Sequence, residues 1–205
     1  MSAARRDLDG AETRNRILDA ARALFVEHGI EQTTVRAIAG AVGITAPALY
    51  HHFPDKDALV RELVLTDMRR LGAVFARVMR VADPVERLVE LGLAYVRFGL
   101  ENPQHYRLLF MLPHDDVKQG GHEPSPEEDA YGLLHVTVGQ AIRERRLGPD
   151  YQDADQVSQI CWAAVHGLVS LHVVFGEHEW VEWRDVEVTA GRMLRALVTG
   201  MTAGA

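Results

Sequence analysis

The sequence of this 205-residue chain predicts an all-α fold. Apolar residues recur at the 3.6-residue spacing of amphipathic helices, and neither internal repeats nor strand-like alternation stand out. Residues 33–56 also read as two short helices joined by a tight turn, which is the layout of a helix-turn-helix. We therefore expect about nine helices, divided into a tail over 1–10 that is expected to be disordered, a three-helix DNA-binding domain over 11–56, and a helical domain over 57–205.

The first predicted helix spans about residues 12–28. Its inward face is formed by apolar residues at helical spacing, namely Ile17, Leu18, Ala21, Leu24 and Phe25. Gly29 directly follows this predicted helix.

The next two helices are short and their ends are well marked. Thr33 or Thr34 can cap the first, Gly43 supplies the left-handed conformation that ends it, and Thr45 can cap the second, with Pro47 in its first turn. Four apolar residues give the first of these helices one buried face: Val35, Ile38, Ala39 and Val42.

In the second short helix Leu49 and Phe53 lie four residues apart and point inward, which leaves a small, polar and aromatic surface. Small side chains let a helix approach base edges closely, while Thr, Tyr, His and Lys can contact phosphates. The alternative is that these residues only cap and pack a small three-helix unit.

Six further helices are expected at about 55–81, 84–101, 103–112, 127–146, 153–176 and 184–201. Asp83-Pro84 and Asn102-Pro103 each combine a capping residue with a first-turn proline. Residues 113–126 are rich in turn formers and are expected to form a mobile loop.

The motifs of the amino-terminal region resemble the DNA-binding domain of the TetR family of bacterial transcriptional regulators. The resemblance runs over about residues 12–60 and rests on Thr-Thr-Val-Arg-x-Ile-Ala at 33–39 and on Leu-Tyr-x-His-Phe-x-x-Lys at 49–56. Pro54 departs modestly from the pattern. Together with the surface analysis, this resemblance gives the candidate DNA-binding residues Val35, Arg36, Thr45, Ala46, Pro47, Tyr50, His51, His52 and Lys56.

The net charge of −7 lies away from this candidate surface. Residues 1–56 contain seven Lys/Arg and seven Asp/Glu, so residues 57–205 carry fifteen against twenty-two and hold the whole excess. An acidic body is repelled by a duplex, which would orient the amino-terminal domain toward DNA. Arg5 and Arg6 could reach a minor groove, but Asp7 and Asp9 dilute them, so we favour a weakly contributing tail.

Two late helices carry unusually apolar faces, which predicts that two copies pair as a four-helix bundle. The candidate dimer residues are Val157, Ile160, Ala164, Leu168, Leu171 and Phe175 in one helix, with Met193, Leu194 and Leu197 in the other. A dimer also suits a palindromic operator on double-stranded DNA, because one short helix reads few base pairs. The alternative is a monomer that buries both faces.

Trp162-x-x-x-His166-Gly167 resembles the signature of the Trp-His-Gly subgroup of the family. Packing is the expected role of this motif, with ligand binding by His166 as the alternative. The resemblance implies a small-molecule effector that shifts the fourth helix and weakens operator binding by a repressor. Candidate pocket residues are Tyr95, Phe98, Tyr106, Phe110, Met111, Leu133, Trp162 and His166.

Composition and motifs argue against other classes. The apolar stretches are interrupted well before about 18 residues, and the amino terminus lacks the apolar segment of a signal peptide, so we expect a cytoplasmic protein with no membrane partner. The family resemblance implies that the protein is bacterial. The single cysteine, Cys161, suits buried packing better than redox chemistry. The competing functions are an interaction scaffold that does not read sequence and a metal-dependent enzyme.

No catalytic residues, metal ligands or cofactors are predicted. His114, Asp115, Asp116, His122 and Glu123 are close in sequence, but they lie on the expected loop. A His-x-x-x-His helix, a Cys-x-x-Cys pair and a glycine-rich phosphate loop are all missing from the sequence, so adventitious metal binding is the alternative kept open for this loop.

Overall fold

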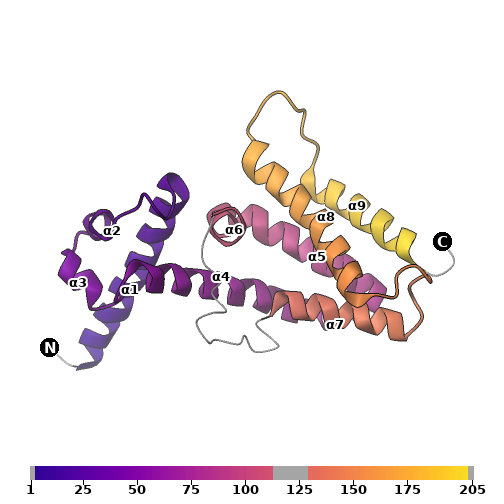
Figure 1. Cartoon of the computed structure of the whole chain (residues 1–205), viewed down its shortest axis with the longest axis horizontal. Coiled ribbons are helices and arrows are strands. Elements are labelled where there is room, and N and C mark those ends of the chain that lie inside the picture. The colour runs from indigo at the N-terminus through magenta and orange to yellow at the C-terminus, as the bar shows by residue number, and fades with distance from the viewer. Residues whose placement is uncertain (1–2, 113–128, 203–205) are drawn as a thin grey trace. The chain divides into compact units, whose positions relative to one another are not determined.

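The computed structural model describes residues 3–112 and 129–202, and within them the chain forms nine helices. They are α1 (Ala3–His28), α2 (Val35–Val42), α3 (Ala46–Tyr50), α4 (Lys56–Val78), α5 (Pro84–Glu101), α6 (Pro103–Phe110), α7 (Ala130–Arg143), α8 (Ala154–Phe175) and α9 (Val186–Met201). Figure 1 shows this order along the chain. The all-α prediction is confirmed.

The chain divides into two compact units. Unit 1 comprises Met1–Asp67 and Gln104–His122, and unit 2 comprises Met68–Pro103 and Glu123–Ala205. This division differs from the expected boundary at residues 56/57, because the first three turns of α4 and nearly all of α6 group with α1–α3. The long helix α4 runs without a break across the division at residues 67/68.

Unit 1 is built around apolar side chains from each of its helices. Its largest fully buried side chains are Ile17, Phe25, Ile38, Leu49, Leu59, Leu63, Tyr106 and Leu108. Helix α2 contacts both α1 and α3. These contacts give the short helices a fixed support, which is needed because a two-turn helix is not stable by itself in water.

Unit 2 is organised around α5, which contacts α7, α8 and α9. The N-cap Asp83 and Pro84 start α5, and the Asp83 carboxylate accepts a hydrogen bond from the Val85 amide at 2.8 Å. Gly92 allows α9 to approach α5, because a Cβ atom at this position would lie 2.8 Å from Leu194 Cδ1. Helix α5 is therefore the buried centre of this unit.

The observed helix ends differ from the expected ends mainly at α1 and α7. Helix α1 begins at Ala3, so residues 3–10 of the segment expected as a disordered tail are helical; Ala and Arg are good helix formers. Helix α7 covers 130–143 rather than 127–146, and Arg145 just after it has a φ of 57°. The loop expected over 113–126, with its acidic and histidine residues, lies outside the described residues.

Candidate nucleic-acid interface

The starts of α2 and α3 are each fixed by a threonine cap, and a glycine ends α2. The Thr34 hydroxyl oxygen accepts from the Ala37 amide at 3.1 Å, and the Thr45 hydroxyl oxygen accepts from the Ala48 amide at 3.3 Å. Gly43 has a φ of 79°, a conformation that strains side-chain-bearing residues. Thr34 is thus the cap of α2, while the buried Thr33 donates to the Gly29 carbonyl at 2.8 Å.

Helix α3 is held from one side and exposed on the other. Leu49 and Phe53 are buried, whereas half of the Tyr50 side chain surface (50%) is exposed. The remaining predicted DNA-binding residues around this turn are exposed at Arg36, Thr45, Pro47 and His51, and half-buried at Val35, Ala46 and His52. These residues lie on α2, α3 and the α3–α4 connection, and none of them is fully buried.

Lys56 has a different setting from the other candidates. Its ammonium group donates to the Ile30 carbonyl at 2.8 Å and lies 3.5 Å from the Glu31 carbonyl. Both acceptors belong to the connection between α1 and α2. Lys56 thus holds this connection against the start of α4, a role that its sequence position did not reveal.

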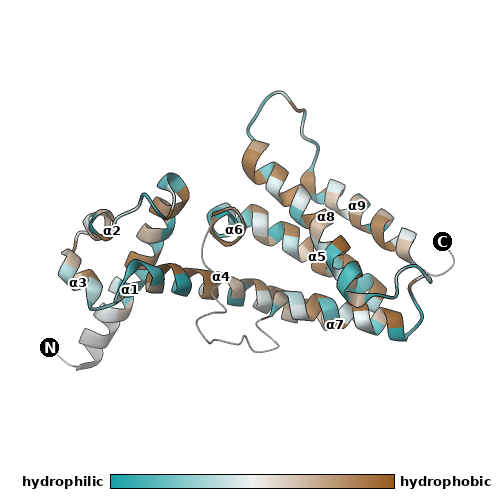
Figure 2. Ribbon diagram, viewed as in Figure 1, coloured by the Kyte–Doolittle hydropathy of each residue, from teal (hydrophilic) through white to brown (hydrophobic). Residues whose placement is uncertain are grey.

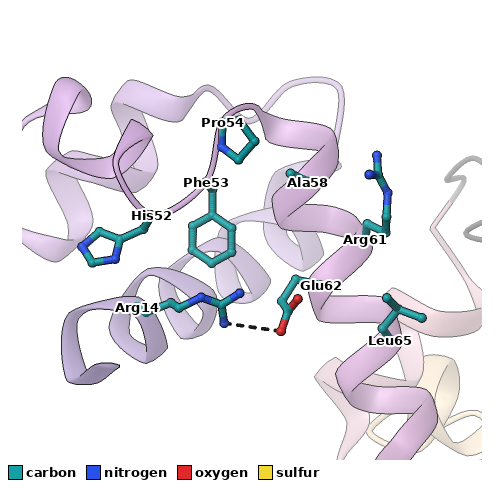
Figure 3. Close-up of a pocket in the computed structure, with 8 residues that line it drawn as sticks. All are labelled: Arg14, His52, Phe53, Pro54, Ala58, Arg61, Glu62 and Leu65. Carbon is teal, nitrogen blue, oxygen red and sulfur yellow. Dashed lines mark hydrogen bonds and ion pairs between the residues drawn. The ribbon is translucent and has the colours of Figure 1, made fainter. Parts of the chain in front are cut away.

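A shallow hollow lies behind His52, between α1, the α3–α4 connection and α4 (Figure 3). Its volume is about 250 Å³. Arg14 crosses it, with its guanidinium 4.7 Å from the centre of the Phe53 ring and 3.3 Å from a Glu62 carboxylate oxygen. Arg14 was not predicted from the sequence, because its partners lie 39 or more positions away in the chain.

Part of the predicted effector site forms a hydrogen-bonded aromatic cluster in unit 2. Trp162 Nε1 donates to Tyr95 Oη at 3.4 Å, and Tyr95 Oη lies 3.0 Å from His166 Nδ1. Tyr131, which the sequence did not single out, meets the Trp162 ring edge-on at 5.9 Å between ring centres. Burial lowers the pKa of His166 and so favours its neutral form, in which an unprotonated Nδ1 accepts a hydrogen bond from the Tyr95 hydroxyl group.

The other predicted pocket residues are divided between the two units. Tyr106 is fully buried in unit 1, where the centre of its ring lies 5.1 Å from the centre of the Phe110 ring. Met111 belongs to the same unit. Phe98 is buried in unit 2, and Leu133 is half-buried there. Sequence spacing alone could not separate core aromatics from pocket aromatics.

The predicted dimer residues divide into buried and accessible positions. Val157 and Leu194 are buried inside unit 2, whereas Leu171 is 47% exposed. The other six, Ile160, Ala164, Leu168, Phe175, Met193 and Leu197, are half-buried. Val174 and Val188, which were not predicted, are also exposed, at 45% and 51%.

Helix α8 is long and apolar enough to cross a membrane by length and composition alone, and 28% of that stretch is buried within the chain. The expectation that the apolar stretches are interrupted well before about 18 residues is therefore wrong for α8, which has no Asp, Glu, Lys or Arg after Asp155. Figure 2 shows hydrophobic residues on the last turns of α8. These properties are weak evidence for a membrane span, because core helices of soluble proteins share them.

Among the described residues, no group of three or more His, Cys, Asp or Glu side chains is placed to hold a metal ion.

A capped helix-turn-helix packed on a buried helical core, joined to a second all-helical unit, is the architecture of helix-turn-helix transcriptional regulators. Residues 17–63 match the family model described as bacterial regulatory proteins, tetR family, and residues 88–197 match the tetracyclin repressor-like C-terminal domain. The chain belongs to the TetR family of transcriptional regulators. The carboxy-terminal match does not specify the Trp-His-Gly subgroup, so assignment to that subgroup stays a prediction.

Curated relatives and solved structures agree with this membership. The transcriptional regulator UidR of Escherichia coli K12 is 28% identical over 193 residues, covering 92% of both chains. The repressor KstR2 of Mycobacterium tuberculosis is 33% identical over 112 residues, covering 54% of each. The solved structure of KstR2, a ketosteroid transcriptional regulator, aligns with a TM-score of 0.67 at 26% identity, over 93% of this chain and 95% of that one.

Proposed function

We propose that this protein is a repressor that binds a palindromic operator as a homodimer and is released by a small-molecule effector. The observation that carries the DNA-binding part is the arrangement of α3, which is anchored through Leu49 and Phe53 while Thr45, Pro47 and Tyr50 face solvent. A helix supported in this way can enter a major groove without unfolding its own packing.

Dimerisation is supported by the open faces of α8 and α9. Ala163, Gly167, Leu171 and Val174 share one side of α8, at positions i, i+4, i+8 and i+11, and none is fully buried. On α9, Met193, Ala196, Leu197 and Gly200 share a side in the same way. A Cβ atom at Gly167 or Gly200 would have no neighbour within 4 Å, so two helices can approach closely there.

The effector is proposed to act through the aromatic cluster of Tyr95, Tyr131, Trp162 and His166. Trp162 and Tyr131 are 39% and 38% exposed, so a ligand can reach their rings, while Tyr95 and His166 supply polar groups beside them. A structural relative is described as a ketosteroid regulator, which makes ketosteroids a first set of compounds to test for release of bound DNA.

The decisive experiment is selection of genomic DNA fragments from the source bacterium at physiological salt. A repressor of this kind enriches a palindrome, and the fragments also reveal the half-site spacing and neighbouring genes. An interaction scaffold that does not read sequence would enrich no motif. It would show only the weak, strongly salt-dependent binding expected of nonspecific contacts.

The residues are tested with an Arg36→Ala, Tyr50→Ala, His52→Ala triple variant. Its affinity for the selected palindrome should fall by at least about 100-fold, because each contact contributes roughly 1–3 kcal/mol. A matched control changes the same residue types in unit 2: Arg143→Ala, Tyr151→Ala and His135→Ala. Full affinity in the first variant would defeat the assignment of this surface.

A further inference from the structure

Three side chains from three helices of unit 1 meet at a buried carboxylate. Asp67 of α4 is fully buried, and Arg22 of α1 is 5% exposed. Arg22 Nη2 donates to Asp67 Oδ1 at 2.9 Å and Arg22 Nε lies 3.4 Å from Oδ2. His105 of α6 lies with Nδ1 2.7 Å from Asp67 Oδ1. Because an ionised carboxylate only accepts hydrogen bonds, His105 Nδ1–H is the donor. We call these residues the Asp67 cluster.

A cluster of this kind is a costly way to hold helices together. Apolar side chains of similar volume often stabilise a core as well as a buried ion pair does, because the ion pair loses its hydration. Its hydrogen bonds are directional, however, so they restrict the helices to one relative orientation where apolar contacts permit several. The geometry therefore points to a role in orientation as well as in stability.

The Asp67 cluster lies at positions in the chain where a fixed helix orientation can affect the DNA-binding helices. The chain passes from unit 1 to unit 2 directly after Asp67, and it returns between Pro103 and Gln104, one residue before His105. Arg22 belongs to α1, which packs against α2 of the helix-turn-helix. The Asp67 cluster thus joins the support of the DNA-binding helices to two of the points where the chain passes between the units, at residues 67/68 and 103/104.

We propose that His105, through Asp67 and Arg22, is a positioning residue that sets the direction of α1–α3 relative to α4. This proposal rests on the proposed function, because a fixed direction matters when two copies must place their α3 helices at one separation on DNA. Without the His105 bond, each helix-turn-helix still reads its half-site, but the two copies no longer hold a single spacing.

The test is selection from a library of random DNA duplexes by wild-type protein and by two substitutions of the same residue. His105→Leu removes the donor and approximately keeps the apolar volume, whereas His105→Asn keeps an N–H near the position of Nδ1. We expect His105→Leu to enrich the wild-type half-site with spacings broadened by about one base pair in each direction. Its affinity for the wild-type operator should fall about tenfold, and His105→Asn should recover most of it.

A control in the same unit is His28→Asn, at an exposed histidine of α1. Unchanged spacing and affinity in His105→Leu would overturn the proposal, as would equal loss in His105→Asn and His105→Leu. If His105→Leu loses its helical circular dichroism, His105→Gln, whose longer side chain misplaces the donor, replaces it in the same comparison. Failure of the wild-type protein to enrich any motif would instead refute the proposed function.

Discussion

Arg22 and Asp67 form a buried ion pair that their neighbours in the sequence do not reveal. In the sequence Arg22 follows Ala21 in an amphipathic pattern, and Asp67 lies in the polar stretch of a long helix. Helical periodicity predicted the apolar face of α1 correctly at Ile17, Ala21 and Phe25. It could not predict a buried charge pair, because the partners are 45 positions apart and only the tertiary fold brings them together.

Arg22→Ala is expected to lower the free energy of unfolding by about 3–5 kcal/mol, because it leaves the Asp67 carboxylate buried without its charged partner. Arg97→Ala removes an exposed ion pair with Glu187, whose side chains are 49% and 58% exposed, and should cost about 1 kcal/mol or less. Urea denaturation measured by circular dichroism compares the two variants. If both variants lost the same free energy of unfolding, burial of the Arg22–Asp67 pair would not explain its contribution to stability.

Because of His166, the free energy of unfolding should decrease as the pH is lowered from neutral to mildly acidic values. Because burial lowers its pKa in the folded state, the unfolded state binds the proton more readily. Its contribution to stability is therefore complete above the unfolded pKa of about 6.5 and is lost as pH falls toward the lower, folded value.

The His166 effect is measured from urea midpoints at several pH values between neutral and mildly acidic conditions. His166→Phe, which cannot titrate, should lose less stability on acidification than the wild type. His178→Phe, at an exposed histidine of the α8–α9 connection, serves as the comparison and should follow the wild type. A steeper loss in His166→Phe would show that the sign is wrong.

At the scale of elements, local sequence rules worked where local chemistry decides the structure. Thr34, Gly43 and Thr45 have the capping and turn roles expected from their positions. The rules were less successful at Lys56 and Arg14, because both bind groups that are brought close only by tertiary packing. The start of α1 was also missed: it was expected near residue 12, whereas the helix begins at Ala3.

Alanine substitutions at two nearby glycines, Gly40 and Gly43, should change the stability of the protein in opposite directions. Gly43→Ala forces a side chain into the left-handed region and should cost about 1–2 kcal/mol. Gly40→Ala, at an exposed position inside α2 with no neighbour within 4 Å of the added carbon, should stabilise by roughly 0.5–1 kcal/mol. Thermal unfolding of both variants checks the prediction, and a shift of the same sign in both would contradict it.

For the whole molecule, helical periodicity predicted that α8 and α9 are apolar. It did not predict which face of each helix is buried within the chain. Val157 and Leu171 both belong to the predicted interface pattern, yet the first is buried and the second is exposed. Helix α8 is apolar on both sides, so the sequence carries no polar side to mark solvent. The packing of α5 against α8 and α9 decides the question.

Leu171→Glu is expected to convert the proposed dimer into a monomer. By two-fold symmetry the change occurs twice, so the dissociation constant should rise by at least about 100-fold through lost apolar burial alone. Val136→Glu changes a similarly exposed valine on α7 (54%) and should leave assembly unchanged. Analytical ultracentrifugation distinguishes the outcomes, and a dimeric Leu171→Glu protein with wild-type affinity would refute this interface.

The three tryptophans differ in their access to solvent. Trp180 is 72% exposed, while Trp162 and Trp183 are each tied by an indole N–H hydrogen bond, to Tyr95 and to the Phe175 carbonyl respectively. A dissolved collisional quencher such as iodide should therefore extinguish Trp180 emission most effectively. The α8–α9 connection thus contains an intrinsic optical probe, with which assembly can be followed without attaching a dye.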